Sequence, residues 1–370
     1  MSLNTKYSWS DLSVDILSSV AERLPYIDLF SFGAVCKRWR ACVVRGIQYA
    51  PVVIRYCSYQ QGYALELVDL LPMRLHRIGN TILQGHLLFD CRLHASKHGW
   101  LLFSKPQQEQ YSFFFYNPLG KIMELPRLDM DTFNTQKDVK VAATFSTSPT
   151  CDDCVIFVIL HRSTDGLRST SKDCIISTCN LRDNRWITRK YPRPNDHEVG
   201  ALAYVDGVFH CVFYMRCLSI TFATFHLALA DWVMTDYSAL SKLALAFTWK
   251  CYLVESGGEL LLVFYGLDYY FDGNRDSLYW HIYRFDPSRK DWTRLFTLGN
   301  RALLIYGMSS SITISPAKKE IADKILCFDY ERTSCITYPS RIQKYSCQSI
   351  YSSILSMDMS HFRESISNFI

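Results

Sequence analysis

The pattern of apolar and polar positions divides the chain into two parts with different periods. In residues 9–44 apolar positions recur three and four residues apart, which places them on one face of a helix. The first set is Leu12, Ile16, Leu17, Val20 and Leu24. Ser10 or Ser13 is expected to cap this helix and Pro25 to end it. Asp28 is expected to cap a second short helix, and Cys36 to Arg40 continue in helical register.

From residue 51 onward short apolar runs typical of β-strands replace the helical period. Gly, Pro, Asn and Asp clusters separate these runs. The predicted strands cover residues 52–56, 100–103, 113–116, 155–160, 208–213, 260–265 and 280–285. The aromatic content of 14% also favours β structure.

A weak internal repeat links the predicted strands. An apolar strand ends in a short polar residue or His, and six positions later a large or soft apolar residue opens the next strand. The pairs are Asn117/Met123, Asn180/Trp186, His226/Trp232, Asp286/Trp292 and Asp329/Cys335. Three second positions are Trp, although the chain has eight tryptophans in all. We expect these three to occupy equivalent sites, largely buried between units.

Recurrence at roughly 50 residues with two or more strands per unit is typical of β-propeller blades. Residues 51–350 are therefore predicted to hold five to seven blades, with about six as the central expectation. A β-sandwich or two sheet domains with coincidental hairpins is the alternative. Because a ring must join its first and last blades, residues 52–56 are expected to pair in the same sheet as residues 325–338. A strand within residues 345–356 is the alternative closure.

The N-terminal segment resembles an F-box. The resemblance rests on Trp9 to Leu17, Arg23-Leu24-Pro25, Asp28-Leu29 and Ala34 to Arg40, with Val-Cys-Lys-x-Trp at the expected spacing. The family pattern usually has Pro where this chain has Ser13.

The resemblance implies binding to the Skp-family adaptor of a cullin-RING ubiquitin ligase. A small helical unit with a contiguous apolar patch is an interaction site. The residues that match the motif are Leu12, Ile16, Leu17, Val20, Leu24, Leu29, Val35, Cys36 and Trp39. Some of these must hold the helices together, and the sequence does not divide the two roles.

The remainder is similar to the plant F-box proteins with a C-terminal propeller of kelch-like blades. The similarity rests on residues 98–102, on 116–126 and on 285–292, followed by 298–304. The strict kelch Gly-Gly pair is missing from most predicted blades. The expected fold is therefore mainly β with a small N-terminal all-α unit, namely a three-helix F-box followed by a β-propeller. The expected boundaries are a disordered leader at 1–8, the F-box at 9–45, the propeller at 46–350 and a tail at 351–370.

Composition and charge narrow the function classes. Apolar residues make up 49% and charged residues 20%, which excludes disorder as the dominant state. A net charge of +5 is too small for non-specific nucleic-acid binding, so no nucleic acid is expected as a partner. No stretch approaches 18 uninterrupted apolar residues, so no membrane is expected either. Without a hydrophobic signal core at the N-terminus, the 14 cysteines are read as reduced, small apolar residues. The expected location is the nucleus, the cytoplasm or both.

Constellations that carry chemistry are weak, so no cofactor and no metal are expected. Cys151 and Cys154, with Cys174 and Cys179, suggest a zinc ribbon, but the second pair is too widely spaced. His94 and His98 lie four apart without the Glu of a zincin motif and are assigned to a loop. Gly257-Gly258 is read as a hairpin turn, and the basic residues of 182–189 and Lys318-Lys319 as solvated loops.

The leading hypothesis is a non-catalytic substrate receptor of an SCF-type ubiquitin ligase. The F-box would dock on the adaptor, and through it on cullin and RING subunits, while the propeller holds an unknown target protein. The alternatives are an F-box scaffold acting outside the ligase, and a propeller enzyme or glycan-binding lectin with a helical leader. The enzyme reading predicts a carboxylate-rich pocket at the propeller axis. The receptor reading predicts an aromatic and Arg-bearing rim.

Overall fold

A computed structural model describes most of the chain and divides it into two compact units. The described residues are 9–24, 26–42, 52–59, 62–69, 74–77, 91–107, 110–117, 121–129, 139–162, 173–192, 198–215, 219–235, 250–267, 278–306, 310–314, 322–328, 333–337 and 348–349. Unit 1 is Met1–Phe89 with Ala317–Glu320, and unit 2 is Asp90–Pro316 with Ile321–Ile370. The expected leader, the expected tail, Pro25 and Lys318-Lys319 lie outside the described residues.

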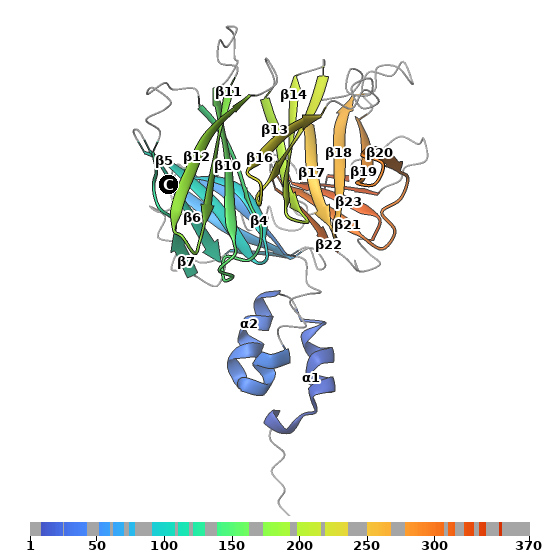
Figure 1. The fold of residues 1–370 in the computed structure, drawn as a ribbon. Helices are drawn as coiled ribbons and strands as arrows, with labels where there is room; N and C mark the ends of the chain where they lie inside the picture. The colour runs from blue at the N-terminus through green and yellow to red at the C-terminus, as the bar shows by residue number, and fades with distance from the viewer. Residues whose placement is uncertain are drawn as a thin grey trace, which may run out of the picture. The chain divides into compact units, whose positions relative to one another are not determined.

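Unit 1 begins with the predicted helices. They are η1 (Trp9–Asp11), α1 (Val14–Ala21) and α2 (Tyr26–Val35), followed by helical residues 37–42 (Figure 1). The Ser13 hydroxyl accepts a hydrogen bond from the Ile16 amide at 3.4 Å, so Ser13 is the N-cap of α1. The prediction that Asp28 caps α2 is wrong, because α2 begins at Tyr26 and Asp28 lies in its first turn. There the carboxylate still faces the positive end of the helix dipole.

Unit 1 also contains sheet A, whose strands pair only with one another among the described residues. It consists of β1 (Val52–Tyr59), β2 (Gly62–Asp69) and β3 (Arg74–Arg77), all antiparallel. The predicted pairing of residues 52–56 with 325–338 is therefore wrong. β2 follows β1 after two residues, and such a short loop closes at little entropic cost. The apolar residues Leu65 and Leu67 on either side of Glu66 are the signal for β2 that the sequence analysis missed.

Unit 2 consists of five further sheets, B to F, and confirms the predicted strands it contains. Sheets B to E run outward from the first strand in chain order. Sheet B has β4 (Arg92–Lys97), β5 (Trp100–Gln107), β6 (Gln110–Asn117), β7 (Lys121–Glu124) and β8 (Leu128–Asp129). Sheet C has β9 (Val139–Phe145), β10 (Val155–Arg162), β11 (Asp173–Asn180) and β12 (Arg185–Pro192). Sheet D has β13 (Glu198–Val205), β14 (Val208–Met215), β15 (Ser219–His226) and β16 (Asp231–Thr235). Sheet E has β17 (Lys250–Ser256), β18 (Glu259–Leu267), β19 (Leu278–Asp286) and β20 (Asp291–Leu295).

Sheet F has a different strand order. Its strands, from the inside outward, are β22 (Ser310–Ile314), β21 (Ala302–Tyr306), β23 (Lys324–Phe328), β24 (Thr333–Thr337) and β25 (Gln348–Ser349). β21 and β23 are parallel, because the chain crosses over β21 after forming the innermost strand β22. β25 adds a short C-terminal strand to the outer side of β24. It lies within residues 345–356, but the predicted alternative closure by this segment is wrong, because β22 is the strand of sheet F that contacts β4.

The innermost strands close a ring. β4 contacts β9, β9 contacts β13, β13 contacts β17, β17 contacts β22, and β22 contacts β4. In the part of the chain that the structure describes, unit 2 is therefore a propeller of five blades. Five lies within the predicted range of five to seven, and the three-stranded sheet A belongs to unit 1.

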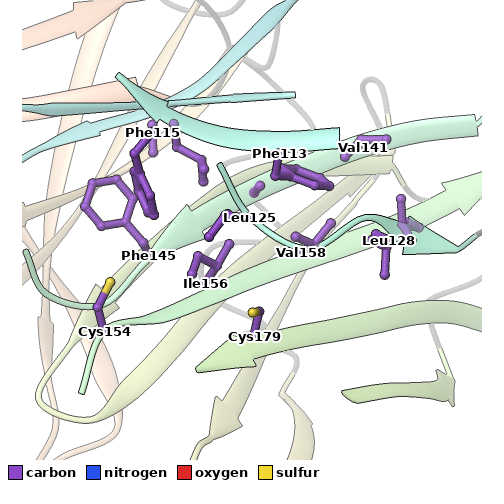
Figure 2. Packing of buried hydrophobic residues seen from close by; sticks show 14 of the residues in the cluster. Phe113, Phe115, Leu125, Leu128, Val141, Phe145, Cys154, Ile156, Val158 and Cys179 are labelled. Atoms are coloured by element: carbon purple, nitrogen blue, oxygen red, sulfur yellow. The ribbon is translucent and has the colours of Figure 1, made fainter. Parts of the chain in front are cut away.

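Adjacent blades bury apolar side chains between their faces. Phe113 and Phe115 of sheet B meet Phe145, Ile156 and Val158 of sheet C (Figure 2). Similar clusters join sheets C and D, D and E, and E and F. These strands are apolar on both faces because both faces are covered, which explains the continuous apolar runs in the sequence.

Two kinds of turn punctuate the blades. β4 and β5 are joined by the two-residue turn His98-Gly99, in which φ is 51° and 73°. Such positive φ values suit the twist of a tight hairpin. The assignment of His94 to His98 to a loop is therefore wrong for residues 94–97, which belong to β4. The predicted Gly257-Gly258 hairpin is confirmed between β17 and β18.

Candidate interaction surfaces

The structure places most of the nine predicted F-box residues in two groups. Leu17 is fully buried with Ala21, Phe32 and Cys42. Leu12, Leu24 and Trp39 pack against this core. The Trp39 ring lies 4.3 Å from that of Phe32, measured between centroids. These members of the motif hold the helices together.

The other group faces solvent. Ile16 is 52% exposed, Val20 40% and Val35 56%. Ile16 and Val20 are one helical turn apart on α1 and so share a stripe beside the buried one. Cys36 is half-buried, and the side chain of Leu29 lies outside the described set. Trp9 at 75% and Val14 at 42% are exposed apolar residues that the helical-face criterion did not select.

Exposed apolar side chains are therefore concentrated on a very small helical module. Burying an aliphatic side chain is worth about 1.5–3 kcal/mol. Patches left in water by a folded unit are characteristic of interaction sites. The arrangement suits an apolar partner that covers α1 and the end of α2.

A lysine marks one end of the propeller ring. Lys97, at the end of β4, donates a hydrogen bond to the Phe145 carbonyl on β9 at 3.1 Å. Its ammonium also lies 5.9 Å from the ring centre of Tyr204 on β13. Because β4 contacts β9 but reaches β13 only across the ring, the side chain of Lys97 extends toward the axis.

Lys97 is half-buried and lies beside aromatic rings. Burial lowers the pKa of Lys97 to about 8, whereas the Glu255 carboxylate opposes this shift. Burial raises the pKa of the nearby Tyr204. The exposed carboxylates nearby belong to Asp206, in the turn after β13, and to Glu255, near the end of β17. The sequence analysis did not select Lys97. The signal that was available is its position directly before the tight turn at His98-Gly99.

Most of the cysteines that suggested a zinc site are buried in the structure as small apolar residues. Cys154, Cys174 and Cys179 are buried and Cys151 is exposed. Cys154 and Cys179 belong to the core between sheets B and C (Figure 2). Burial raises the pKa of each of these two thiols to about 11, which opposes formation of the thiolate that a metal needs. No group of three or more potential metal ligands is found among the described residues.

The two histidines of the candidate metal pair, His94 and His98, also do not form a site. His94 is fully buried on β4, where its Nε2 lies 2.6 Å from the Ser104 hydroxyl. Burial lowers the pKa of His94 to about 3, so this imidazole is neutral. His98 is exposed in the neighbouring turn. The two side chains therefore occupy different environments.

The three repeat tryptophans occupy equivalent positions, as predicted. They lie on the outermost strands of sheets C, D and E, opposite Cys179, Phe225 and Phe285 respectively. The Trp186 indole donates to the Pro126 carbonyl at 2.7 Å, and the Trp232 indole donates to that of Pro192 at 3.0 Å. Trp292 is buried, whereas Trp186 and Trp232 are half-buried. Each tryptophan contacts the preceding blade.

The two outer members of the repeat differ in register. Met123 stands opposite Phe115, two residues before Asn117, because the first hairpin loop is shorter. Cys335 stands opposite Leu326. The reading of residues 182–189 as a solvated loop is wrong from Arg185 onward, because β12 begins there.

The described helices include none long and apolar enough to cross a membrane.

Helices with an exposed apolar stripe, followed by a ring of β-sheets, define the class of F-box proteins with a propeller. The F-box domain pattern matches residues 9–45. The KIB1-4 beta-propeller pattern matches residues 71–348. The chain belongs to this KIB1-4 propeller family.

Similar proteins occur in Arabidopsis thaliana. The F-box protein At3g56470 is 25% identical over 341 residues, which cover 89% of this chain and 81% of the relative. The F-box/kelch-repeat protein At1g57790 is 25% identical over 315 residues, which cover 82% and 80%.

Among solved structures the chain is similar to the Aleuria aurantia lectin, with 11% identity and a TM-score of 0.37. That match covers 81% of this chain and 93% of the lectin. A prolyl endopeptidase matches with 9% identity and a TM-score of 0.35, over 67% of this chain and 32% of that one. Likeness at this level carries no information about function.

Proposed function

We propose that this protein is the substrate-recognition subunit of an SCF-type ubiquitin ligase. The F-box docks on a Skp-family adaptor, which connects it to cullin and RING subunits, and the propeller holds a target protein for ubiquitination. The observation that supports this proposal is the solvent-facing stripe of Ile16 and Val20 within an F-box. The site of action is the nucleus, the cytoplasm or both.

In this role the chain performs no covalent chemistry itself. The assembly holds the target near the charged ubiquitin-conjugating enzyme, and proximity raises the rate by replacing a bimolecular encounter. A propeller suits this task because its blades form a rigid scaffold for variable loops. Specificity then resides in side chains displayed on the blades.

Double replacement of Ile16 and Val20 by Ala tests the docking step. If the adaptor covers the exposed part of both side chains, the lost burial is worth about 2 kcal/mol, which raises the dissociation constant about thirtyfold. Isothermal titration of a purified Skp-family adaptor into the full chain measures the effect. Because both side chains are exposed, circular dichroism should show unchanged folding.

Two variants serve as controls. Ser19→Ala changes an exposed residue of the same helix and should leave the affinity unchanged. Leu17→Ala removes a core residue, and should unfold the module and abolish binding indirectly. Retention of wild-type affinity by the Ile16/Val20 double variant would reject the proposed function.

A further inference from the structure

Strand β12 is the longest outermost strand in sheets B to E. It has eight residues, whereas β7 has four and β16 and β20 have five each. In the described part of the chain its backbone pairs with β11 on one side only. A regular unpaired edge of this length is a template for another strand.

The exposed side chains of β12 carry mainly positive charge. Arg185, Arg189 and Lys190 are exposed, and Arg182 stands in the turn before them. None of these four cations forms an ion pair within the described residues. Asp183 is the sole acidic residue of 181–190. Ile187, between the two arginines, is 50% exposed.

Strand alternation sorts these residues onto two faces. Trp186 packs toward sheet B, where its ring lies 5.5 Å from that of Phe113. Arg185, Ile187 and Arg189 share the opposite face. Tyr191, also on that face, donates to the Ala230 carbonyl at 3.1 Å and so fixes the end of the strand against sheet D. The other edge of β12 pairs with no strand in the described part of the chain.

We propose that the edge of β12 receives an extended acidic segment of the target protein as an added strand. This inference rests on the proposed receptor function and names the chemistry of its target. Main-chain hydrogen bonds supply affinity in such strand addition, and alternate side chains supply specificity. Carboxylates facing Arg185 and Arg189, with an apolar residue facing Ile187, give the segment the alternation acidic-x-apolar-x-acidic.

The spacing favours a protein chain over a nucleic acid. Residues two apart on a strand are separated by about 6.6 Å, and an extended partner repeats at the same interval. Opposite-charge cross-strand pairs and an apolar pair each contribute about 0.2–1 kcal/mol. A phosphate backbone would satisfy the arginines, yet would leave Ile187 and the strand edge unmatched.

Charges on an edge strand also prevent aggregation, so the test reverses the charge instead of removing it. The full chain, bound to its adaptor, is titrated with a fluorescent peptide that contains Glu-Thr-Val-Thr-Glu. We expect the double variant Arg185→Glu with Arg189→Glu to lose at least tenfold in affinity. The same variant should bind the peptide Lys-Thr-Val-Thr-Lys in its place.

Matched controls separate strand addition from general charge attraction. Arg289→Glu with Lys290→Glu reverses two exposed cations in a turn of sheet E and should leave the affinity unchanged. A peptide of the same composition with adjacent glutamates should bind at least fivefold more weakly. N-methylation of alternate peptide amides should abolish binding by removing the main-chain donors.

Several outcomes would overturn the inference. They are equal binding by wild-type and charge-reversed chains, equal binding of the N-methylated peptide, or preference for a single-stranded RNA or for anionic phosphatidylserine vesicles. Adaptor affinity is measured on the same samples. If the adaptor binds but the peptide does not, the edge inference fails while the receptor function stands. If the wild-type chain binds no adaptor, the proposed function fails instead.

Discussion

Three histidines of the propeller have imidazoles withdrawn from water. Burial lowers the pKa of His94 to about 3, and those of His210 and His281 to about 4. An unfolded chain takes up protons at these side chains near pH 6.5, whereas the folded chain does not. Below pH 6.5 the unfolded state therefore binds more protons, and protonation favours unfolding.

We predict that the free energy of unfolding falls as the pH drops from about 6.5 to about 4. Each histidine contributes a slope of up to about 1.4 kcal/mol per pH unit. Urea denaturation at a series of pH values measures the slope. The variant His94→Gln keeps a polar group near Ser104 but does not titrate there. The slope of its unfolding free energy with pH should therefore be smaller by the contribution of one histidine. Equal slopes in the two proteins would contradict a neutral, buried His94.

At the residue scale the sequence predicted the F-box positions but not their division of labour. Helical spacing places Ile16 and Leu17 on adjacent lines of the same helix. Which line faces the other helices depends on how α1 packs on Phe32 and Trp39. That packing is a tertiary property, and one helix carries no record of it.

The recurring hairpin is the element that joins the blades. In sheets C, D and E a four-residue turn ends with a left-handed residue, namely Asn184, Ala230 or Lys290, with φ between 47° and 50°. Each turn returns the chain so that a tryptophan reaches the preceding blade. The sequence repeat was detectable because this geometry fixes the interval from strand end to tryptophan.

Replacing Trp186 by Phe should weaken the contact between sheets B and C. The variant loses the hydrogen bond to the Pro126 carbonyl and part of the ring contact with Phe113. Loss of a buried hydrogen bond and of ring volume costs about 1–3 kcal/mol. Chemical denaturation followed by far-ultraviolet circular dichroism measures the change. Trp9→Phe, at an exposed F-box position, should change it by less than about 0.5 kcal/mol; comparable effects of the two exchanges would refute the bridging role.

Other elements escaped prediction because they depend on partners distant in sequence. The repeat pair Asp329/Cys335 predicted two successive strands within residues 325–338, and β23 and β24 do pair there as antiparallel neighbours. Nothing in those residues specifies that β23 runs parallel to β21, with β22 innermost. The order follows from which strand fits between β17 and β4 when the ring closes.

At the scale of the whole molecule, sheet F completes the ring. Its innermost strand contacts both β17 and β4. A chain that ends at Leu298 lacks this sheet and leaves two inner strands uncovered. Open, apolar sheet edges promote association.

We therefore expect the chain ending at Leu298 to elute as aggregates in size-exclusion chromatography. A chain ending at Ser349 keeps every described strand and should elute as the full-length protein does. A monomeric, cooperatively unfolding chain that ends at Leu298 would show that four blades suffice.

The contact between β4 and β22 has a consequence for synthesis on the ribosome. β4 leaves the exit tunnel early, but its neighbour in the ring lies roughly 200 residues further along the chain. At about 5–20 residues per second, sheet B waits on the order of 10–40 s for that neighbour. During this interval a nascent chain exposes an apolar flank, and molecular chaperones are the cell's means of shielding it. The rate of translation between these two strands should therefore govern the yield of soluble protein in the cell.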